Sequence, residues 1–175
     1  MKKTIPLMLL LATLFLASCA SKSNYATGTI DMGVVVKDVD ASIKFYEKLG
    51  FTKFGEFNVP KEVAGDAGLL NYKAANIKVM TLNGDAADTK LKLIASRTAK
   101  TTANAFIDSS LGISYITLFV KDAGLTLANL KKHNIKVTAK GPVDLTPVGF
   151  QPNFLIVIQD PDGNFIEFVG PILTK

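Results

Sequence analysis

The stretch IDMGVVVKDVDASIKFYEKLGFTKFGEF, residues 30–57, decides the fold, because a similar stretch returns later in the chain. The second copy is ISYITLFVKDAGLTLANLKKHNIKVTAK, residues 113–140. Each copy opens with an alternating apolar pattern that ends in Val-Lys-Asp, which is typical of a strand. A helical spacing of apolar residues follows, and a turn then leads into another strand. The repeat predicts two similar units, each beginning strand–helix–strand.

Two more strands are expected in each unit. In the first unit they cover about 77–82 and 90–95, and the Asn-Gly between them is a hairpin signal. In the second unit they cover about 153–159 and 164–169, joined by Asp-Pro-Asp-Gly. The sequence therefore predicts an α+β fold of two tandem βαβββ units. Residues 58–76 have no counterpart and are expected to form a loop or short helix over one end, and 102–112 link the units.

The N-terminus has the features of an export signal. A basic start precedes thirteen apolar residues, 5–17, which are too few to span a bilayer and suit a signal peptide over 1–18. The ending LASC resembles a bacterial lipobox, and its Cys19 is the only cysteine of the chain. We expect Cys19 to be lipidated, with residues 19–28 as a tether, since two or more acyl chains anchor a protein stably. An ordinary cleaved signal is the alternative.

The residues after Cys19 bear on localisation. Ala20 and Ser21, with no aspartate, favour the outer membrane by resemblance to enteric sorting, facing the periplasm. The chain has 20 Lys and Arg against 15 Asp and Glu, and Arg97 is the only arginine. No basic cluster alternates with aromatics, so no nucleic-acid partner is expected. The domain also lacks a phosphate-binding G-x-x-x-x-G-K motif, a G-x-S-x-G motif and a cysteine nucleophile.

Two motifs identify a family resemblance. VKDVDASIKFYEKLGF, residues 36–51, and the closing DPDGNFIEFV, residues 160–169, lie within the doubled βαβββ pattern. Together they resemble the vicinal oxygen chelate superfamily, which includes glyoxalase I, extradiol dioxygenases and the bleomycin and fosfomycin resistance proteins. The resemblance implies a domain over 29–175, with units at about 29–97 and 113–172. In this fold the units form a curled mixed sheet with an internal groove for ligands, and the helices lie outside.

Metal-using relatives hold one divalent ion at four groove positions. The resemblance places Asp31, Lys92, Tyr115 and Glu167 there, with Lys90 as the other inward candidate for the second position. Of these four positions, only Glu167 matches the family. A protonated lysine cannot ligate a metal, and tyrosine is a poor ligand for zinc, nickel or manganese. We therefore expect no cofactor, and Lys92 and Tyr115 disfavour the divalent metal that the family allows. His133, the one histidine, is expected in solvent at the end of a helix.

Lys92 is expected to replace the metal. An ammonium between Asp31 and Glu167 would offset the repulsion of two carboxylates in the groove. The alternative is three exposed strand charges that never meet. Tyr115 and Phe119 either form an aromatic wall for a flat or apolar ligand or fill a collapsed groove. By strand alternation, or by position in a loop, the remaining groove candidates are Thr117, Phe165 and Phe150.

Three functions are consistent with these residues. The favoured one is a lipid-anchored envelope protein that binds a small molecule in a metal-free groove. The second is a lyase, isomerase or dioxygenase-like enzyme, metal-dependent or metal-independent. The metal-independent version would use Glu167 as general base, with Lys92 or Tyr115 as the oxyanion donor. The third is an assembly role with envelope partners, and a homodimer would fit the first or the third.

Overall fold

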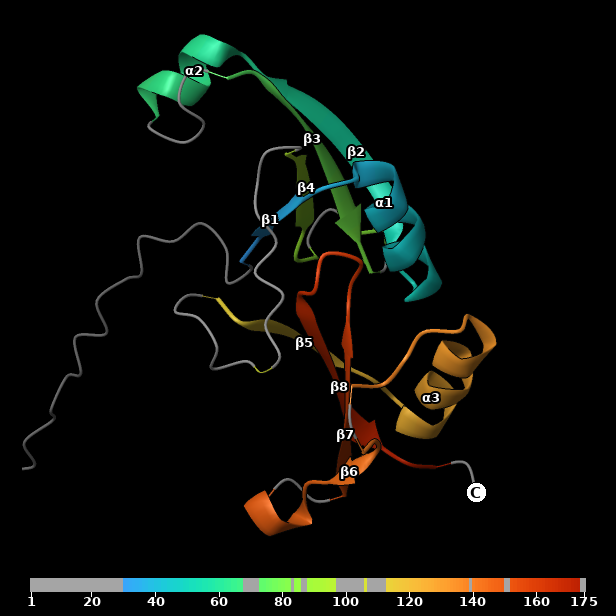
Figure 1. Ribbon diagram of the computed structural model, residues 1–175. Helices are drawn as coiled ribbons and strands as arrows, with labels where there is room; N and C mark the ends of the chain where they lie inside the picture. Colours follow the sequence, from blue (N-terminus) through green and yellow to red (C-terminus); the bar gives the residue numbers. More distant parts are fainter. Residues whose placement is uncertain are drawn as a thin grey trace, which may run out of the picture.

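The computed structural model describes residues 30–67, 73–82, 84–85, 88–96, 106, 113–138, 140–149 and 152–173. Two four-stranded sheets follow one another along the chain, each with a helix packed on one side (Figure 1). In the part of the chain that is described, no helix is long and apolar enough to cross a membrane.

The first unit has strand order β1-β4-β3-β2, with β1 parallel to β4 and the other neighbours antiparallel. The short helix α2 lies in the segment without a counterpart, as expected. The elements are β1 (Met32–Val36), α1 (Val39–Lys48), β2 (Thr52–Val59), α2 (Lys61–Asp66), β3 (Ala75–Thr81) and β4 (Leu91–Ala95).

The second unit repeats this arrangement in the order β5-β8-β7-β6, with β5 parallel to β8. The α+β class and the doubled βαβββ order are therefore confirmed, with two open sheets in place of a closed barrel. The elements are β5 (Tyr115–Phe119), α3 (Ala123–Lys132), β6 (Val143–Asp144), the 3-10 helix η1 (Thr146–Val148), β7 (Asn153–Gln159) and β8 (Phe165–Pro171).

The strand expected directly after α3 begins later than expected and is short. Val137 makes only an isolated bridge to Ile158, and regular pairing with β7 begins later, in the two-residue β6. Pro142 lies between these points, and its nitrogen has no hydrogen to donate to the ladder. The edge of the second sheet is therefore interrupted for several residues, whereas β2 at the edge of the first sheet has only a register shift between Lys53 and Gly55.

The repeated Val-Lys-Asp ends in the residue that starts each long helix. The Asp38 carboxylate accepts hydrogen bonds of 3.0 Å from the backbone N–H groups of Asp40 and Ala41 at the start of α1. Asp122 does the same for Gly124 at 2.7 Å and Leu125 at 3.3 Å, at the start of α3. An N-cap aspartate satisfies N–H groups that have no partner inside the helix. The repeat thus encodes the helix starts.

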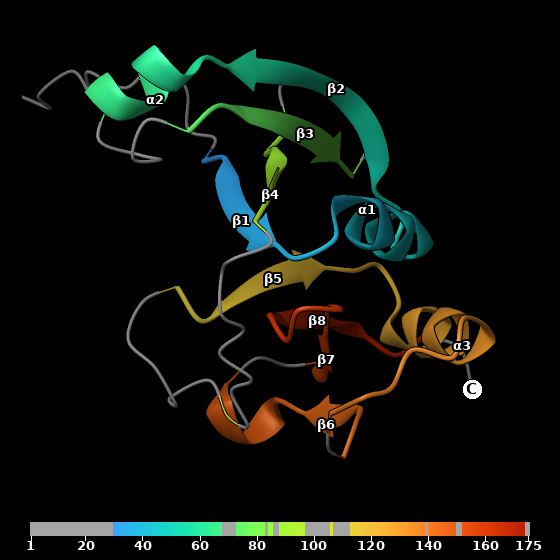
Figure 2. The same cartoon turned by 45° about the horizontal axis from the view of Figure 1, so that its top comes forward.

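The core lies between the helices and one face of the sheets. Side chains alternate along a strand, so Met32, Val34 and Val36 face this core and Gly33 and Val35 face the opposite side. Figures 1 and 2 show α1 and α3 on the same side of the two sheets. One buried cluster draws on both units: Val36, Tyr46, Phe51, Met80, Leu91, Leu93, Ala123, Leu130, Ile156, Ile158, Ile166 and Phe168.

A buried hydrogen bond joins the two units. The hydroxyl of Tyr46 on α1 donates to the Asp160 carboxylate in the β7–β8 turn at 2.9 Å. Burial and the neighbouring Asp160 charge raise the pKa of Tyr46 well above its ordinary value. The backbone N–H of Lys37 reaches Asp162 at 3.2 Å. By contrast, β1 and β5 lie beside each other as sheet edges in Figure 2, and no ladder pairs them among the described residues.

Candidate functional site

The faces of the sheets turned away from the helices carry the predicted groove residues. In the first unit Lys92 on β4 lies opposite Gly33 on β1. In the second unit Glu167 on β8 lies opposite Thr117 on β5. In each unit the pair lies where the first strand runs parallel to the last one, β1 with β4 and β5 with β8. Lys92 and Glu167 therefore occupy equivalent positions in the two units. One half offers an ammonium where the other offers a carboxylate.

Lys92 forms an ion pair with Asp31. Its Nζ lies 2.9 Å from Asp31 Oδ2, and the two side chains are 34% and 36% exposed. The other carboxylate oxygen of Asp31 accepts the backbone N–H of Lys90 at 3.0 Å. The hydrogen bond from Lys92, and then that from the Lys90 backbone, lower the pKa of Asp31. Asp31 is therefore a carboxylate already supplied with a cation.

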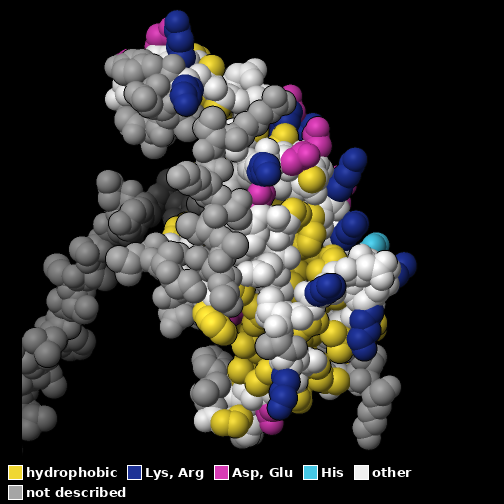
Figure 3. All heavy atoms as spheres, in the orientation of Figure 1, with side chains coloured by type: hydrophobic (Ala, Val, Ile, Leu, Met, Phe, Trp, Pro, Cys, Tyr) yellow, Lys and Arg dark blue, Asp and Glu magenta, His cyan; other side chains and the backbone are white. Residues whose placement is uncertain are grey.

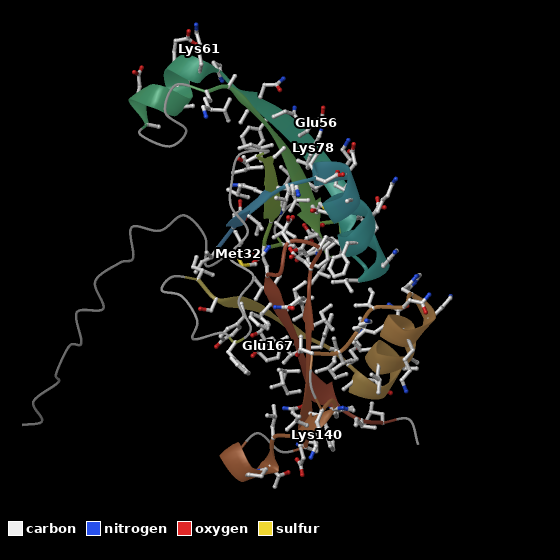
Figure 4. The ribbon with its side chains drawn as sticks, in the orientation of Figure 1. Met32, Glu56, Lys61, Lys78, Lys140 and Glu167 are labelled. Carbon is white, nitrogen blue, oxygen red and sulfur yellow. The ribbon has the colours of Figure 1, made fainter. Side chains whose placement is uncertain are left out.

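Glu167 does not join this pair, which corrects the expectation of a lysine between two carboxylates. Its Oε2 accepts the hydroxyl of Thr117 at 2.9 Å, and no described Lys, Arg or His lies within ion-pair distance of it. Lys92 reaches Asp31, next to the start of β1 in its own sheet. Glu167, labelled in Figure 4, belongs to the other sheet and lies midway along β8. Lys92 and Glu167 both lie on the groove side of the fold but do not contact each other.

Lys90, the other inward candidate, serves the loop before β4. Its side chain is buried, and its Nζ donates to the carbonyl oxygens of Asp85, at 3.1 Å, and of Asp88. The same ammonium lies 4.8 Å from the centre of the Phe54 ring. Alternation would put Lys90 and Lys92 on the same face, so the contacts of Lys90 with this loop, and not alternation, leave Lys92 as the groove residue.

The aromatic groove candidates differ in exposure. Phe165 is 6% exposed, Tyr115 is 45% exposed and Phe119 is 84% exposed. Alternation puts Tyr115, Thr117 and Phe119 on one face of β5, as expected, and Phe165 beside Glu167 on β8. The remaining candidates, Phe150 and the lipidation residue Cys19, lie outside the described residues.

Two hollows lie between β1 and β5. One of about 280 Å³ is lined by Met32–Val35, Tyr46, Ile113–Ile116, Asn164 and Phe165. A second of about 520 Å³ is lined by Ile30, Met32, Phe51, Leu82, Thr89, Leu91 and Tyr115–Phe119. Both linings are largely apolar and both include Tyr115 and Ile116. The second falls within the range typical of small-molecule sites.

The sequence analysis missed part of this lining. Gly33 and Val35 share the strand face that was assigned to Asp31, so strand alternation alone could have placed them in the groove. Asn164 and Tyr46 come from a turn and a helix, and no periodic pattern points to them. Both donate to the Asp160 carboxylate, Tyr46 through its hydroxyl and Asn164 through its side-chain amide at 2.8 Å. This shared partner brings them together beside the smaller hollow.

His133 lies away from the groove, as expected. It is the C-cap of α3 and partly exposed. In Figure 3 the single histidine, in cyan, is at the surface beside lysines, while hydrophobic atoms show along the middle of the same face. This position gives it no access to the groove residues.

The donor set does not fit a divalent cation. Among the described residues, no three His, Cys, Asp or Glu side chains come together closely enough to hold an ion. Of the four family positions, one is the Lys92 ammonium and one is the Asp31 carboxylate paired with it. A cation there would meet the positive charge of Lys92 and compete with it for Asp31.

Comparison with known proteins agrees with the fold. The model of the Glyoxalase/Bleomycin resistance protein/Dioxygenase superfamily matches residues 27–168. The chain belongs to this superfamily. No curated protein matches the chain in sequence.

Solved structures share the fold. A glyoxalase family protein from Bacillus cereus aligns with a TM-score of 0.67 at 21% identity, over 87% of this chain and 98% of that one. The trypanothione-dependent glyoxalase I of Leishmania major aligns with a TM-score of 0.56 at 23% identity, over 81% of this chain and 85% of that one. A glyoxalase family protein from Enterococcus faecalis gives 0.58 at 19% identity, over 79% and 94%. At these identities the likeness shows the fold alone.

Proposed function

We propose that this protein binds a small organic molecule in the groove between its two units, without a divalent metal. The observation that carries the proposal is the 2.9 Å ion pair between Lys92 and Asp31. It puts a cation and its counter-ion at two of the four positions where metal-using relatives hold their ion. An apolar hollow of about 520 Å³ beside β5 supplies the space that a ligand needs.

The first test replaces the ammonium by a carboxylate. Lys92→Glu would set two carboxylates against each other, so we expect its unfolding midpoint to fall without metal and to recover with zinc, nickel or manganese. The matched control, Lys92→Gln, removes the charge and adds no ligand, so metal should not change its midpoint. Thermal unfolding with and without each ion is the measurement.

Metal content of the unmodified protein is the second test. The full chain, purified without chelator or metal-affinity resin, is analysed by mass spectrometry for bound metals. The proposal expects no stoichiometric zinc, nickel, manganese or iron. One equivalent of any of them per chain would overturn the metal-free groove and direct the search toward a metal enzyme.

A metal-independent enzyme is the second candidate. The superfamily includes glyoxalases and dioxygenases, and the observation that favours an enzyme here is Glu167, a partly buried carboxylate oriented by Thr117 at 2.9 Å. Such a carboxylate can accept a proton from a bound substrate. Lyase activity that Glu167→Gln abolishes and that chelators leave unchanged would support this candidate over simple binding.

Anchoring in the cell envelope completes the proposal. Cys19 follows a basic start and an apolar run, and its lipidation would hold the domain at a membrane, facing the periplasm from the outer membrane. Metabolic labelling with a fatty acid, lost in Cys19→Ser, tests it. An assembly role or a homodimer would instead appear as co-purification of an envelope protein or of a second copy that survives groove substitutions.

A further inference from the structure

We infer that the ligand of the groove carries a protonated amine on an aromatic or apolar body, and that Glu167 is the counter-ion of that amine. This inference rests on the proposed function, because it names the chemical class of the molecule bound. It follows from the charge balance of the groove, the apolar surroundings of Glu167 and the aromatic rings along β5.

One groove carboxylate, Glu167, has no cation partner among the described residues. Lys92 and Asp31 neutralise each other at 2.9 Å. Glu167 has a single polar contact among the described residues, the neutral hydroxyl of Thr117. A carboxylate has about four lone-pair sites, and Thr117 occupies only one of them. The described groove residues therefore carry a net charge of −1, located on Glu167.

The surroundings of Glu167 are apolar. On β8 its same-face neighbours are Phe165, 6% exposed, and Val169, 9% exposed. Across the sheet, Val157 on β7 lies directly opposite it, and Leu155 lies opposite Val169. A partly buried carboxylate among such groups loses water contacts without gaining a cation. A ligand ammonium would form a charge-assisted hydrogen bond, stronger than the one that Thr117 donates.

The walls suit the rest of such a ligand. Tyr115 and Phe119 project from the same face of β5 as Thr117. The larger hollow runs along the whole of β5, both faces included, and Thr117 is the lining residue that contacts Glu167. Aromatic rings attract organic cations through their faces and bury apolar surface. An anionic ligand would be repelled by Glu167, and Lys92, the one cation among the described groove residues, is already paired. The site therefore discriminates by charge as well as by shape.

The test uses three naphthyl compounds of different charge. 2-Naphthylmethylamine, 2-naphthalenemethanol and 2-naphthoate share one ring system and are cationic, neutral and anionic at neutral pH. Titration of the full chain, followed by naphthyl fluorescence, should give amine binding about tenfold tighter than alcohol binding, with the carboxylate weakest.

Variants locate the charge preference. Glu167→Gln should weaken amine binding about tenfold, to the level of the alcohol, and leave alcohol binding unchanged. Glu56→Gln is the matched control: it removes the same charge from β2, where Glu56 pairs with Lys78 at 2.6 Å. It should leave all three affinities as they are. Thr117→Val keeps the carboxylate and should keep the amine preference.

The outcomes separate the two proposals. Equal binding of amine and alcohol by the unmodified chain, or an amine preference that survives Glu167→Gln, overturns the inference and leaves groove binding intact. Binding of none of the three molecules overturns the inference and counts against the proposed function as well. Because the ranking in the unmodified chain is itself decisive, the test does not depend on every variant folding.

Discussion

Lys92 shows how one side chain sets the chemistry of a whole groove. The family resemblance assigns its ammonium to one metal position and Asp31, its ion-pair partner, to another. The pair is about one-third exposed, so water screens it, and its contribution to stability is modest. In the proposed function, its role is to keep a metal cation out of the groove.

Removing the ammonium should give a pH-dependent loss of stability. The pKa of Asp31 is lowered in the folded state, so its stabilising contribution is present above the ordinary aspartate pKa and lost as pH falls through the folded value. Lys92→Met should lower the free energy of unfolding by about 0.5–1 kcal/mol near neutral pH, and the difference should shrink in acid, below the ordinary aspartate pKa of about 3.9. Urea unfolding at the two pH values is the measurement.

Lys61→Met is the control for this variant. Lys61 is 67% exposed and lies 3.7 Å from Glu62, so the same side-chain change there should leave stability unchanged at both pH values. A Lys92→Met difference that persists in acid would mean that lost packing of the lysine stem, and not the ion pair, is responsible.

The candidate site was only partly predictable from the sequence, for reasons that the same residues show. Alternation along one strand is local, and it placed Lys92 and Glu167 on the groove side. Whether they meet depends on how two sheets are placed, which alternation does not encode. Thr117 became the partner of Glu167 because the parallel register sets them opposite, and a register between strands 50 residues apart is a tertiary property.

At the scale of elements, the close approach of β5 and β8 gives the sharpest constraint. A Cβ added at Gly170 on β8 would lie 2.2 Å from the carbonyl oxygen of Val120, which directly follows β5. The Val120 N–H in turn donates to the carbonyl of Val169 at 2.9 Å. Glycine is therefore needed at position 170 for the two strands to stay in contact.

Gly170→Ala should push these strands apart and destabilise the protein by about 1–3 kcal/mol, the usual cost of overpacking. Gly55→Ala on β2 is the matched control, because a Cβ there would meet nothing within 4 Å and should be tolerated. Thermal unfolding compares the two variants, and equal midpoints would contradict this account of Gly170.

Elements with local signals were predicted well and those without were not. The helix starts follow from Asp38 and Asp122, whose caps need only the next three residues. The position of the edge strand β6 was not predicted, because Pro142 interrupts its pairing with β7. A segment's own sequence does not specify which strand it will pair with.

At the scale of the whole molecule, Tyr46 and Asp160 join units whose contact residues are 114 positions apart. Tyr46→Phe would leave a buried carboxylate with one partner fewer, and should cost about 1–3 kcal/mol. Tyr115→Phe is the control, since it removes a hydroxyl that has no hydrogen bond among the described residues and should be neutral. Urea unfolding near neutral pH measures both.

The dependence of stability on alkaline pH tests the hydrogen bond between Tyr46 and Asp160. The pKa of Tyr46 is raised in the folded protein, so its contribution is complete below the ordinary tyrosine pKa of about 10 and is lost as pH rises above it. Tyr46→Phe should therefore lose less stability than the unmodified chain above about pH 10. Parallel curves would show that Tyr46 ionises as freely in the folded state as in the unfolded one.

The placement of the bonds between the units has a mechanical consequence. Three hydrogen bonds between the units involve α1 or the segment just before it: Tyr46 with Asp160, Lys37 with Asp162, and the Lys48 carbonyl with Asn129 of α3 at 2.9 Å. The opposite side, between β1 and β5, has hollows and no described ladder. Among the described residues, the two units are therefore joined by hydrogen bonds along α1 and are not paired on the side of β1 and β5. Separating β1 from β5 to admit a ligand would break no hydrogen bond within either sheet.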